Sequence, residues 1–492
     1  AVEYGEMAAQ RAMDVYDYGE AARLIQQAIR VQEVFDPDDK EKKCDLLLEL
    51  SEILVHIPDT KRVHEIEAPE IYSLAKSIGD DSRTAQACIV ALHALTREMA
   101  GASSATPQYI KWAERADQYA KPNTVERAGA DFALARIKLS SGRNTQAARN
   151  ELKQASDLAK DVGAGDVIAG TGIWLIAFTG LQDFEESVKS AENFISELKA
   201  LKTTLIDRSV ALYYIASILL SAGQRERAEE LFDEIQTLAE RSGQYFEQYW
   251  VEVMEILFNI MDGKLEEALD LSEKTLVRGS EEGVERAVRV SIDPYRIRIR
   301  TYLGITDENI KDIVESVDIK LNPRAITIPC LCWAYLGQEE ASTIISQNIL
   351  NISSFDELGV YQLAMYLEAS VVSGHRKAAE LLLDSLQISG WYINSVCPTC
   401  IPRHLGGAAV LLEKYEEARE HYKEAIKVCT EMPFRPELAL SRLQLAELLL
   451  DHYPDEKAEA IKHLDFSIRE FREMKMQPSL ERALRRKNIL KA

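Results

Sequence analysis

One pattern returns along the whole chain and constrains its fold more than any other feature. A loop glycine is followed five residues later by an alanine, and this alanine opens a stripe of residues at positions i, i+3, i+4 and i+7. The stretch LLSAGQRERAEELFDEIQTL (residues 219–238) shows the pattern most fully. The glycine–alanine pairs with this spacing are Gly142 and Ala147, Gly223 and Ala228, Gly263 and Ala268, and Gly374 and Ala379.

The spacing of the stripe is that of one face of an amphipathic α-helix. The glycine lets the chain reverse direction with a left-handed backbone conformation, which other residues adopt at a cost. The small alanine lets the following helix approach the preceding one closely. Each copy of the pattern therefore predicts a helix hairpin.

The predicted loops recur at a nearly constant interval of about 40 residues. A single hairpin cannot bury its apolar stripe, whereas stacked hairpins bury it between neighbours and form a superhelix. No alternating strand pattern competes with this interpretation. The sequence predicts an all-α chain, an α-solenoid of about twelve antiparallel helix pairs, with loops near residues 19, 58, 101, 142, 180, 223, 263, 304, 337, 374, 413 and 454.

We interpret residues 1–492 as a single superhelical domain, with candidate kinks at 100–107, 319–324 and 389–403. The chain begins at Ala1, without an initiator methionine, inside a predicted helix. We therefore expect it to be a piece of a longer protein.

Composition narrows the classes of partner. The chain has 80 Asp and Glu against 58 Lys and Arg, a formal net charge of −22, and this field repels a phosphate backbone. Direct nucleic-acid binding is therefore not expected, whereas basic peptides, cationic ligands and a basic partner domain stay compatible. Seven cysteines, an odd number, do not suggest a disulfide framework, and neither a signal peptide nor an apolar run of about 20 residues is present. We expect a cytoplasmic protein without a membrane anchor.

The repeats resemble tetratricopeptide repeats, although a period near 40 departs from the 34 residues of that family. The best match is HLGGAAVLLEKYEEAREHYKEAI (404–426), through Leu405, Gly406, Tyr415, Ala418, Tyr422 and Ala425. The longer period, together with residues 16–54 and 435–492, is similar to the helical sensor region of bacterial STAND-type signalling ATPases. That resemblance implies an ATPase module and an effector, either a LuxR-type helix-turn-helix or a nucleotide cyclase, outside this chain.

The sequence contains no motif that indicates catalysis. The phosphate-loop pattern G-x-x-x-x-G-K-[ST] is absent, and GAGDVIAGTG (163–172) is better explained by close helix packing at its glycines than by a ligand lying against exposed backbone. Cys397, Cys400 and His404 are close in sequence, but a zinc site needs four convergent ligands, and the other thiols, Cys330 and Cys332, lie nearly two repeats earlier. We interpret these cysteines as buried apolar residues. We expect no enzyme activity, no cofactor and no metal site.

The candidate binding residues come from two stretches of predicted first helices. In DPYRIRIRTYLG (293–304), Arg296 and Arg300 share a helix face while Arg298 points elsewhere. Intramolecular ion pairs or a bound anion would compensate the two like charges. In YFEQYW (245–250) the aromatic residues are either interhelix core or a recognition surface. The predicted ligand- or partner-binding residues are Tyr249, Trp250, Tyr295, Arg296 and Arg300, with Arg403 and His404 extending the groove.

These observations predict a non-catalytic sensor or scaffold module of a bacterial signal-transduction or transcription-regulatory protein. It would hold a protein, a peptide or a small-molecule inducer in the concave groove that its first helices line. A plain protein–protein adaptor without a small-molecule ligand is the first alternative. A helical-repeat enzyme is the second, and the missing catalytic motifs count against it.

Overall fold

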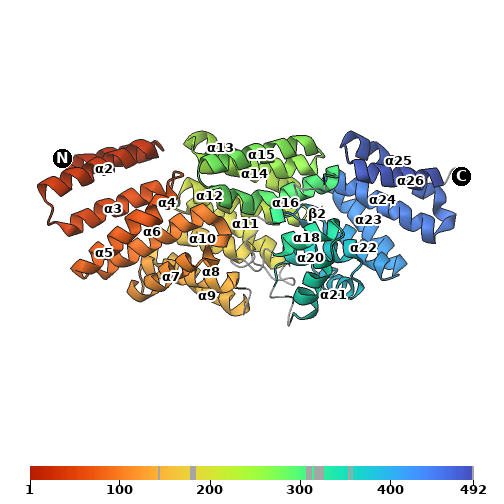
Figure 1. Ribbon diagram of the computed structural model, residues 1–492, viewed down its shortest axis with the longest axis horizontal. Helices are drawn as coiled ribbons and strands as arrows, with labels where there is room; N and C mark the ends of the chain where they lie inside the picture. Colours follow the sequence, from red (N-terminus) through yellow and green to blue (C-terminus); the bar gives the residue numbers. More distant parts are fainter. Residues whose placement is uncertain are drawn as a thin grey trace.

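The protein is an elongated superhelix of helix hairpins, shown by a computed structural model in Figure 1. The structure describes residues 1–141, 145–177, 184–305, 313–314, 326–352, 355 and 358–489. Helices account for 84% of the residues, which confirms the predicted all-α solenoid. The predicted kink at 319–324 and most of the predicted loops near 142 and 180 lie outside the described residues.

The first helices of the pairs lie toward the superhelix interior, apart from the N-terminal helix, in which Ala9 alone is buried. These helices are α1 (Val2–Asp14), α3 (Lys40–Leu54), α6 (Asp81–Met99), α8 (Val125–Ser140), α10 (Gly165–Ala177), α12 (Leu205–Ser221), α14 (Tyr245–Met261), α16 (Glu285–Leu303), α18 (Thr327–Tyr335), α20 (Val360–Ser373), α22 (Ile401–Leu411) and α24 (Arg435–His452).

The second helices pack against them from outside. They are α2 (Tyr18–Phe35), α5 (Ala68–Ile78), α7 (Pro107–Tyr119), α9 (Thr145–Val162), α11 (Phe184–Ala200), α13 (Arg225–Ser242), α15 (Leu265–Glu281), α19 (Glu339–Ile345), α21 (Arg376–Leu386), α23 (Tyr415–Glu431) and α25 (Lys457–Glu473). Several short elements flank the second helices. The short α4 (Thr60–Arg62) and a π-helical turn (Val63–Glu67) precede α5, and a second π-helical turn (Ser346–Leu350) follows α19. A 3-10 turn (Pro454–Glu456) precedes α25, and α26 (Gln477–Ile489) follows α25.

The hairpin loops have the geometry that the repeated glycine–alanine spacing predicts. Gly223, Gly263 and Gly374 have φ values of 83°, 76° and 71°, the left-handed region that glycine adopts readily. The alanines five residues after them are fully buried at the crossing of the two helices: Ala228, Ala268 and Ala379. In the repeat at 413–418 the left-handed residue is Glu413 instead of glycine.

Several helices begin at a residue whose side chain caps the helix N-terminus. Several helices begin after an Asp or Thr whose side chain accepts a hydrogen bond from the backbone N–H three residues later, which satisfies a donor that has no partner within the helix. These capping residues are Asp17, Asp39, Asp80, Thr106, Thr124 and Thr204.

Three glycines of the 163–172 stretch, Gly165, Gly170 and Gly172, serve close packing, as predicted. A Cβ atom at Gly165 would lie 1.9 Å from the carbonyl oxygen of Lys202, and one at Gly172 would lie 2.3 Å from the ring of Phe194. No larger residue fits between these helices.

Two of the predicted kinks fall on described residues. The 100–107 stretch forms a 3-10 helix (Ala100–Ala105) that separates α6 from α7. Within 389–403 the chain forms a two-stranded antiparallel hairpin of β1 (Ile393–Asn394) and β2 (Thr399–Cys400), which no sequence pattern indicated. Each strand has two residues, too few to show an alternation.

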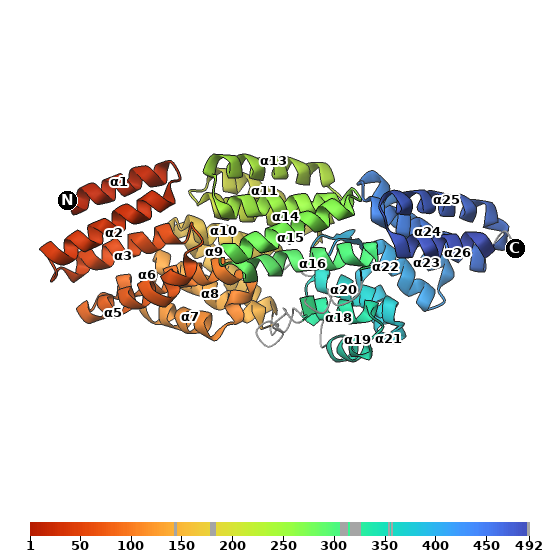
Figure 2. The same cartoon turned by 45° about the horizontal axis from the view of Figure 1, so that its top comes forward.

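Successive turns of the superhelix touch one another. Gln244 donates a hydrogen bond of 3.0 Å to the carbonyl oxygen of Tyr16, 228 residues away, and Arg435 donates one of 3.3 Å to that of Asp262, 173 residues away. Figures 1 and 2 accordingly show α13 to α15 between the N-terminal helices and α24 to α26. Residues of helices several repeats apart are therefore in direct contact.

Candidate functional site

The residues predicted to bind a ligand lie on first helices, as expected. Tyr249 and Trp250 belong to α14, and Arg403 and His404 belong to α22. The other three, Tyr295, Arg296 and Arg300, belong to α16. The structure distributes these residues over three separate groups.

The aromatic residues form a packed cluster inside the superhelix. The ring centroids of Tyr249 and Trp250 are 5.0 Å apart, and those of Tyr213 and Trp250 are 4.6 Å apart. The hydroxyl groups of Tyr213 and Tyr295 lie 3.1 Å apart. Tyr249 and Tyr295 are buried, so this cluster joins α12, α14 and α16 as interhelix core.

Arg296 and Arg300 form ion pairs within the chain, one of the two arrangements considered from the sequence. Arg296 Nη1 lies 2.7 Å from Asp293 Oδ1, and its Nη2 lies 3.1 Å from Glu273 Oε1. Arg300 Nη2 donates to the same Glu273 oxygen at 2.8 Å. Glu273 belongs to α15, so both cations hold α15 against α16. That these residues contact a ligand stays a prediction.

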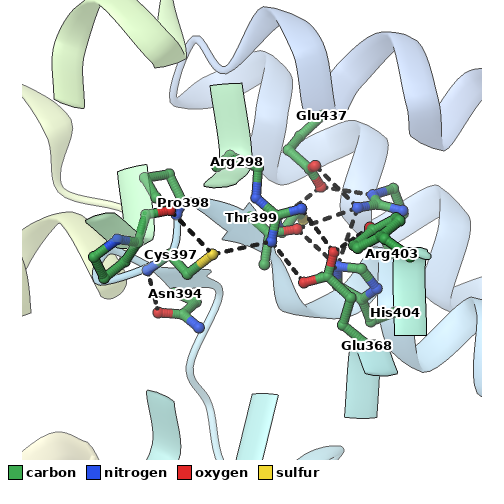
Figure 3. Close-up of polar contacts among 12 residues, drawn as sticks. Arg298, Glu368, Asn394, Cys397, Pro398, Thr399, Arg403, His404 and Glu437 are labelled. Carbon is green, nitrogen blue, oxygen red and sulfur yellow. Dashed lines mark hydrogen bonds and ion pairs between the residues drawn. The ribbon is translucent and has the colours of Figure 1, made fainter. Parts of the chain in front are cut away.

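Arg298 points away from this group and begins a buried network of charged side chains, shown in Figure 3. Its Nη1 and Nη2 donate to the two carboxylate oxygens of Glu368, each at 2.6 Å. Arg403 donates through Nε and Nη2 to the two oxygens of Glu437, at 2.6 and 3.0 Å. Both pairs therefore have the planar, two-bond geometry in which arginine holds a carboxylate most strongly.

Neighbouring groups donate further hydrogen bonds to the same carboxylate oxygens. Tyr335 and Tyr302 donate their hydroxyls to Glu368 and Glu437, each at 2.5 Å. The backbone N–H of Cys400, at the end of the β-hairpin, donates to Glu437 at 2.9 Å. The network therefore joins α16, α18, α20, the hairpin, α22 and α24 into one body.

The network is balanced in charge, with two guanidinium groups facing two carboxylates. His404 stays neutral because burial, and next Arg403, lower its pKa to about 3. Burial alone would raise the pKa of Glu368, but the charge of Arg298 outweighs it and holds that pKa below its ordinary value. A closed, neutral and buried network of this kind supports the fold and has no charge left to offer a ligand.

The sequence analysis missed Glu368 and Glu437. A signal was present, because each is an acidic residue in an otherwise mainly apolar stretch, VYQLAMYLEASVV (360–372) and PELALSRLQLAELLL (436–450). A carboxylate in such a position is buried only if a cation reaches it.

The N-terminal half contains a different group of ionisable side chains on its inner surface. The first helices α3, α6, α10, α12 and α14 contribute Glu52, His93, Arg97, Asp166, Asp207 and Glu247, which we call the inner cluster. Arg97 Nη2 lies 2.5 Å from Asp207 Oδ1 and ties α6 to α12. Glu52, His93 and Asp166 are exposed to water.

Several members of the inner cluster have shifted pKa values although they touch water. Burial, and next the charge of Asp207, raise the pKa of Asp166, and burial lowers the pKa of His93. Burial, and next Asp166, raise the pKa of Glu52. Of the six residues, His93 and Asp166 also line a cavity of about 30 Å³. This part of the inner cluster is therefore open to water and can offer hydrogen-bond donors and acceptors to a bound molecule.

The cysteines are all free and buried, and burial raises the pKa of Cys397 to about 11. Among the described residues, no three His, Cys, Asp or Glu side chains converge as a metal site requires. Within the same part of the chain, no helix has the length and apolar character needed to cross a membrane.

Comparisons with known proteins add little to this geometry. No model of a known protein family matches the chain, and no curated protein matches its sequence. One similar solved structure is the APC/C hetero-tetramer Cut9–Hcn1, with 12% identity, coverage of 98% of this chain and 96% of that one, and a TM-score of 0.46. Another is a circular tandem repeat protein, with 14% identity, coverage of 99% and 96%, and a TM-score of 0.15. Neither value is high enough to indicate a function.

Proposed function

We propose that the chain is a non-catalytic binding module that holds a ligand or a protein partner on the inner surface of its N-terminal half. The observation that carries the proposal is the inner cluster. Five first helices bring its ionisable side chains to the inner surface, and Glu52, His93 and Asp166 keep contact with water. Repeat solenoids bind in this way because many helices present side chains to one partner at once.

The middle and C-terminal parts support this surface in the proposal. Their first helices are joined by the aromatic cluster and by the buried ion pairs of Arg298 and Arg403. A rigid body of this kind keeps the inner surface preformed, which lowers the entropy cost of binding.

The wider context of the proposal rests on sequence resemblance. Residues 16–54 and 435–492 are similar to the sensor region of STAND-type ATPases, so we place the module in a cytoplasmic bacterial signalling protein that carries an ATPase and an effector in other segments. Seven free cysteines fit a reducing compartment. The full-length gene tests this context directly, because a gene without an ATPase module would contradict it.

Site-specific photo-crosslinking in cells tests the binding surface. A photoreactive residue replaces Glu52 or His93 on the inner surface, and in matched control chains it replaces Lys274 or Glu230 on outer helices. The side chains of these two control residues are 72% and 61% exposed. We expect a defined adduct from the inner positions only. A protein adduct would identify an adaptor and a small-molecule adduct a sensor, whereas adducts from the outer positions alone would contradict the proposal.

A further inference from the structure

Arg136 is a buried cation whose hydrogen-bonding capacity is incompletely used. It lies on α8 with 4% of its surface exposed. Its Nη1 donates to the hydroxyl of Thr96 at 2.9 Å, and its Nη2 donates to that of Ser103 at 3.2 Å. The Nε–H is buried and has no partner.

Arg136 differs from the other buried arginines among the described residues. Arg296, Arg298, Arg300 and Arg403 each form an ion pair with a carboxylate. Within the described part of the chain, no carboxylate lies within ion-pair distance of Arg136, although the chain has 80 acidic residues. A buried charge without a counter-charge is unfavourable, so such a residue usually has a function.

Aromatic rings surround the guanidinium group and compensate its charge only in part. The centre of the group lies 4.9 Å from the ring of Trp174, 5.2 Å from that of Tyr109 and 5.5 Å from that of Phe132. The negative faces of these rings attract a cation, and the Tyr109 hydroxyl also interacts with the guanidinium group, but none of these groups supplies a counter-charge. They also restrain the group in one orientation.

A cavity of about 30 Å³ lies beside Arg136 and includes it in its lining. This is more than the roughly 10–15 Å³ that one water molecule needs. His93 and Asp166 also line the cavity. Because both are exposed to water and belong to the inner cluster, the cavity communicates with the proposed binding surface.

We propose that this cavity is a carboxylate-binding subsite, in which Arg136 receives the carboxylate group of a ligand bound on the inner surface. The inference deepens the proposed function, on which it rests for the route of entry. The carboxylate would accept the free Nε–H of Arg136 and a second N–H from one of the Nη nitrogens, and it would supply the missing counter-charge.

A carboxylate fits this cavity better than a phosphate does. It is planar, carries a single charge and needs room for only two oxygens, which suits a cavity of this volume. A phosphate is tetrahedral and carries up to two charges. Either anion would meet the carboxylate of Asp166, which lines the same cavity, but the second charge makes this repulsion larger for a phosphate.

Formate is the probe, because it is the smallest carboxylate and gives a single proton resonance. We expect the purified wild-type chain to broaden the formate line at constant ionic strength, and acetate to reverse the broadening. Phosphate should reverse it much less. Arg136→Met should abolish the broadening, whereas Arg227→Met, at an arginine side chain that is 50% exposed, should leave it unchanged.

A second variant gives an independent answer if Arg136→Met does not fold. Ala133 also lines the cavity and lies three residues before Arg136 on the same helix, so Ala133→Asp places a carboxylate within its reach. We expect this variant to lose the formate response and to unfold at a higher temperature than the wild type.

Three results would overturn the subsite. They are no broadening by the wild type, equal broadening by folded Arg136→Met, and displacement by phosphate as effective as displacement by acetate. The two proposals can fail separately. Formate binding without crosslinks from residues 52 and 93 would contradict only the proposed function, and crosslinks without formate binding would contradict only the subsite.

Discussion

The pair of Arg298 and Glu368 gives the sharpest prediction about the fold. The side chains are 1% and 0% exposed, and two hydrogen bonds of 2.6 Å join them. Two unit charges about 4 Å apart attract each other by about 4 kcal/mol at an effective dielectric constant of about 20. Removing one partner leaves the other charge buried and uncompensated, which typically costs about 3–5 kcal/mol.

The two single variants and the double variant form a thermodynamic cycle. We expect Arg298→Met and Glu368→Gln each to lower the free energy of unfolding by about 3–5 kcal/mol. We expect the double variant to lose clearly less than the sum, because it buries neither unpaired charge. The coupling energy should then be at least about 2 kcal/mol.

Denaturant unfolding followed by far-ultraviolet circular dichroism measures these differences. The exposed ion pair of Arg227 and Glu230 is the control, and its loss should change the free energy of unfolding by less than about 1 kcal/mol. Single variants as stable as the wild type, or strictly additive losses, would refute the reasoning that the network joins α16 to α24 into one body.

Three further predictions follow from the packing, the protonation and the ion pairs. Ala228→Phe should overpack the hairpin crossing and lower the free energy of unfolding by roughly 1–3 kcal/mol or more. The control Glu226→Lys, at an exposed position, should change it by no more than about 0.5 kcal/mol. Equal melting temperatures for the two variants would contradict the predicted register of the repeat. Burial lowers the pKa of His404 to about 3 in the folded chain, against an ordinary value of 6.5, so the unfolded chain binds the proton first as the pH falls. The free energy of unfolding should therefore decrease by up to about 1.4 kcal/mol per pH unit as the pH drops from 6.5 toward 3. His404→Gln should flatten this decline between pH 6.5 and 4.5, and an unchanged slope would count against a neutral buried histidine. Arg296→Ala removes a buried ion pair, so it should lower the free energy of unfolding by about 1–3 kcal/mol and leave crosslinking from position 93 intact. If the folded variant lost this crosslinking, the result would instead support the ligand site that the sequence predicts around Arg296.

The hairpins could be predicted because their determinants are local. A glycine with positive φ and an alanine five residues later specify a close helix crossing within one short stretch. Gly223 and Ala228 show this relation directly. The stacking of hairpins follows from the regular interval, since each stripe must be covered by a neighbour.

The contacts between superhelical turns could not be predicted in the same way. Arg298 and Glu368 are 70 residues apart, and Gln244 and Tyr16 are 228 residues apart. Such pairings depend on the small rotation between successive hairpins, which a single sequence does not specify. The β-hairpin at 393–400 escaped detection because its strands are too short to show a period.

The inner cluster was missed for a related reason. Its residues come from five separate first helices, and none belongs to a local motif. Glu52 and Asp166 lie on different helices, and only the curvature of the superhelix brings them to one surface. Conversely, Arg296 and Arg300 are conspicuous in the sequence because they are close together, whereas the structure pairs both with Glu273.

Histidine footprinting of the wild-type chain, free and bound to the partner captured by crosslinking, tests the proposed binding surface most directly. Diethyl pyrocarbonate modifies histidines that water reaches, and mass spectrometry reports each position separately. We predict that His93 reacts in the free chain and becomes protected in the complex, that exposed His452 reacts equally in both, and that buried His404 reacts in neither. An unreactive His93 in the free chain, or a reactivity that binding leaves unchanged, would contradict the assignment of the inner surface as the binding site.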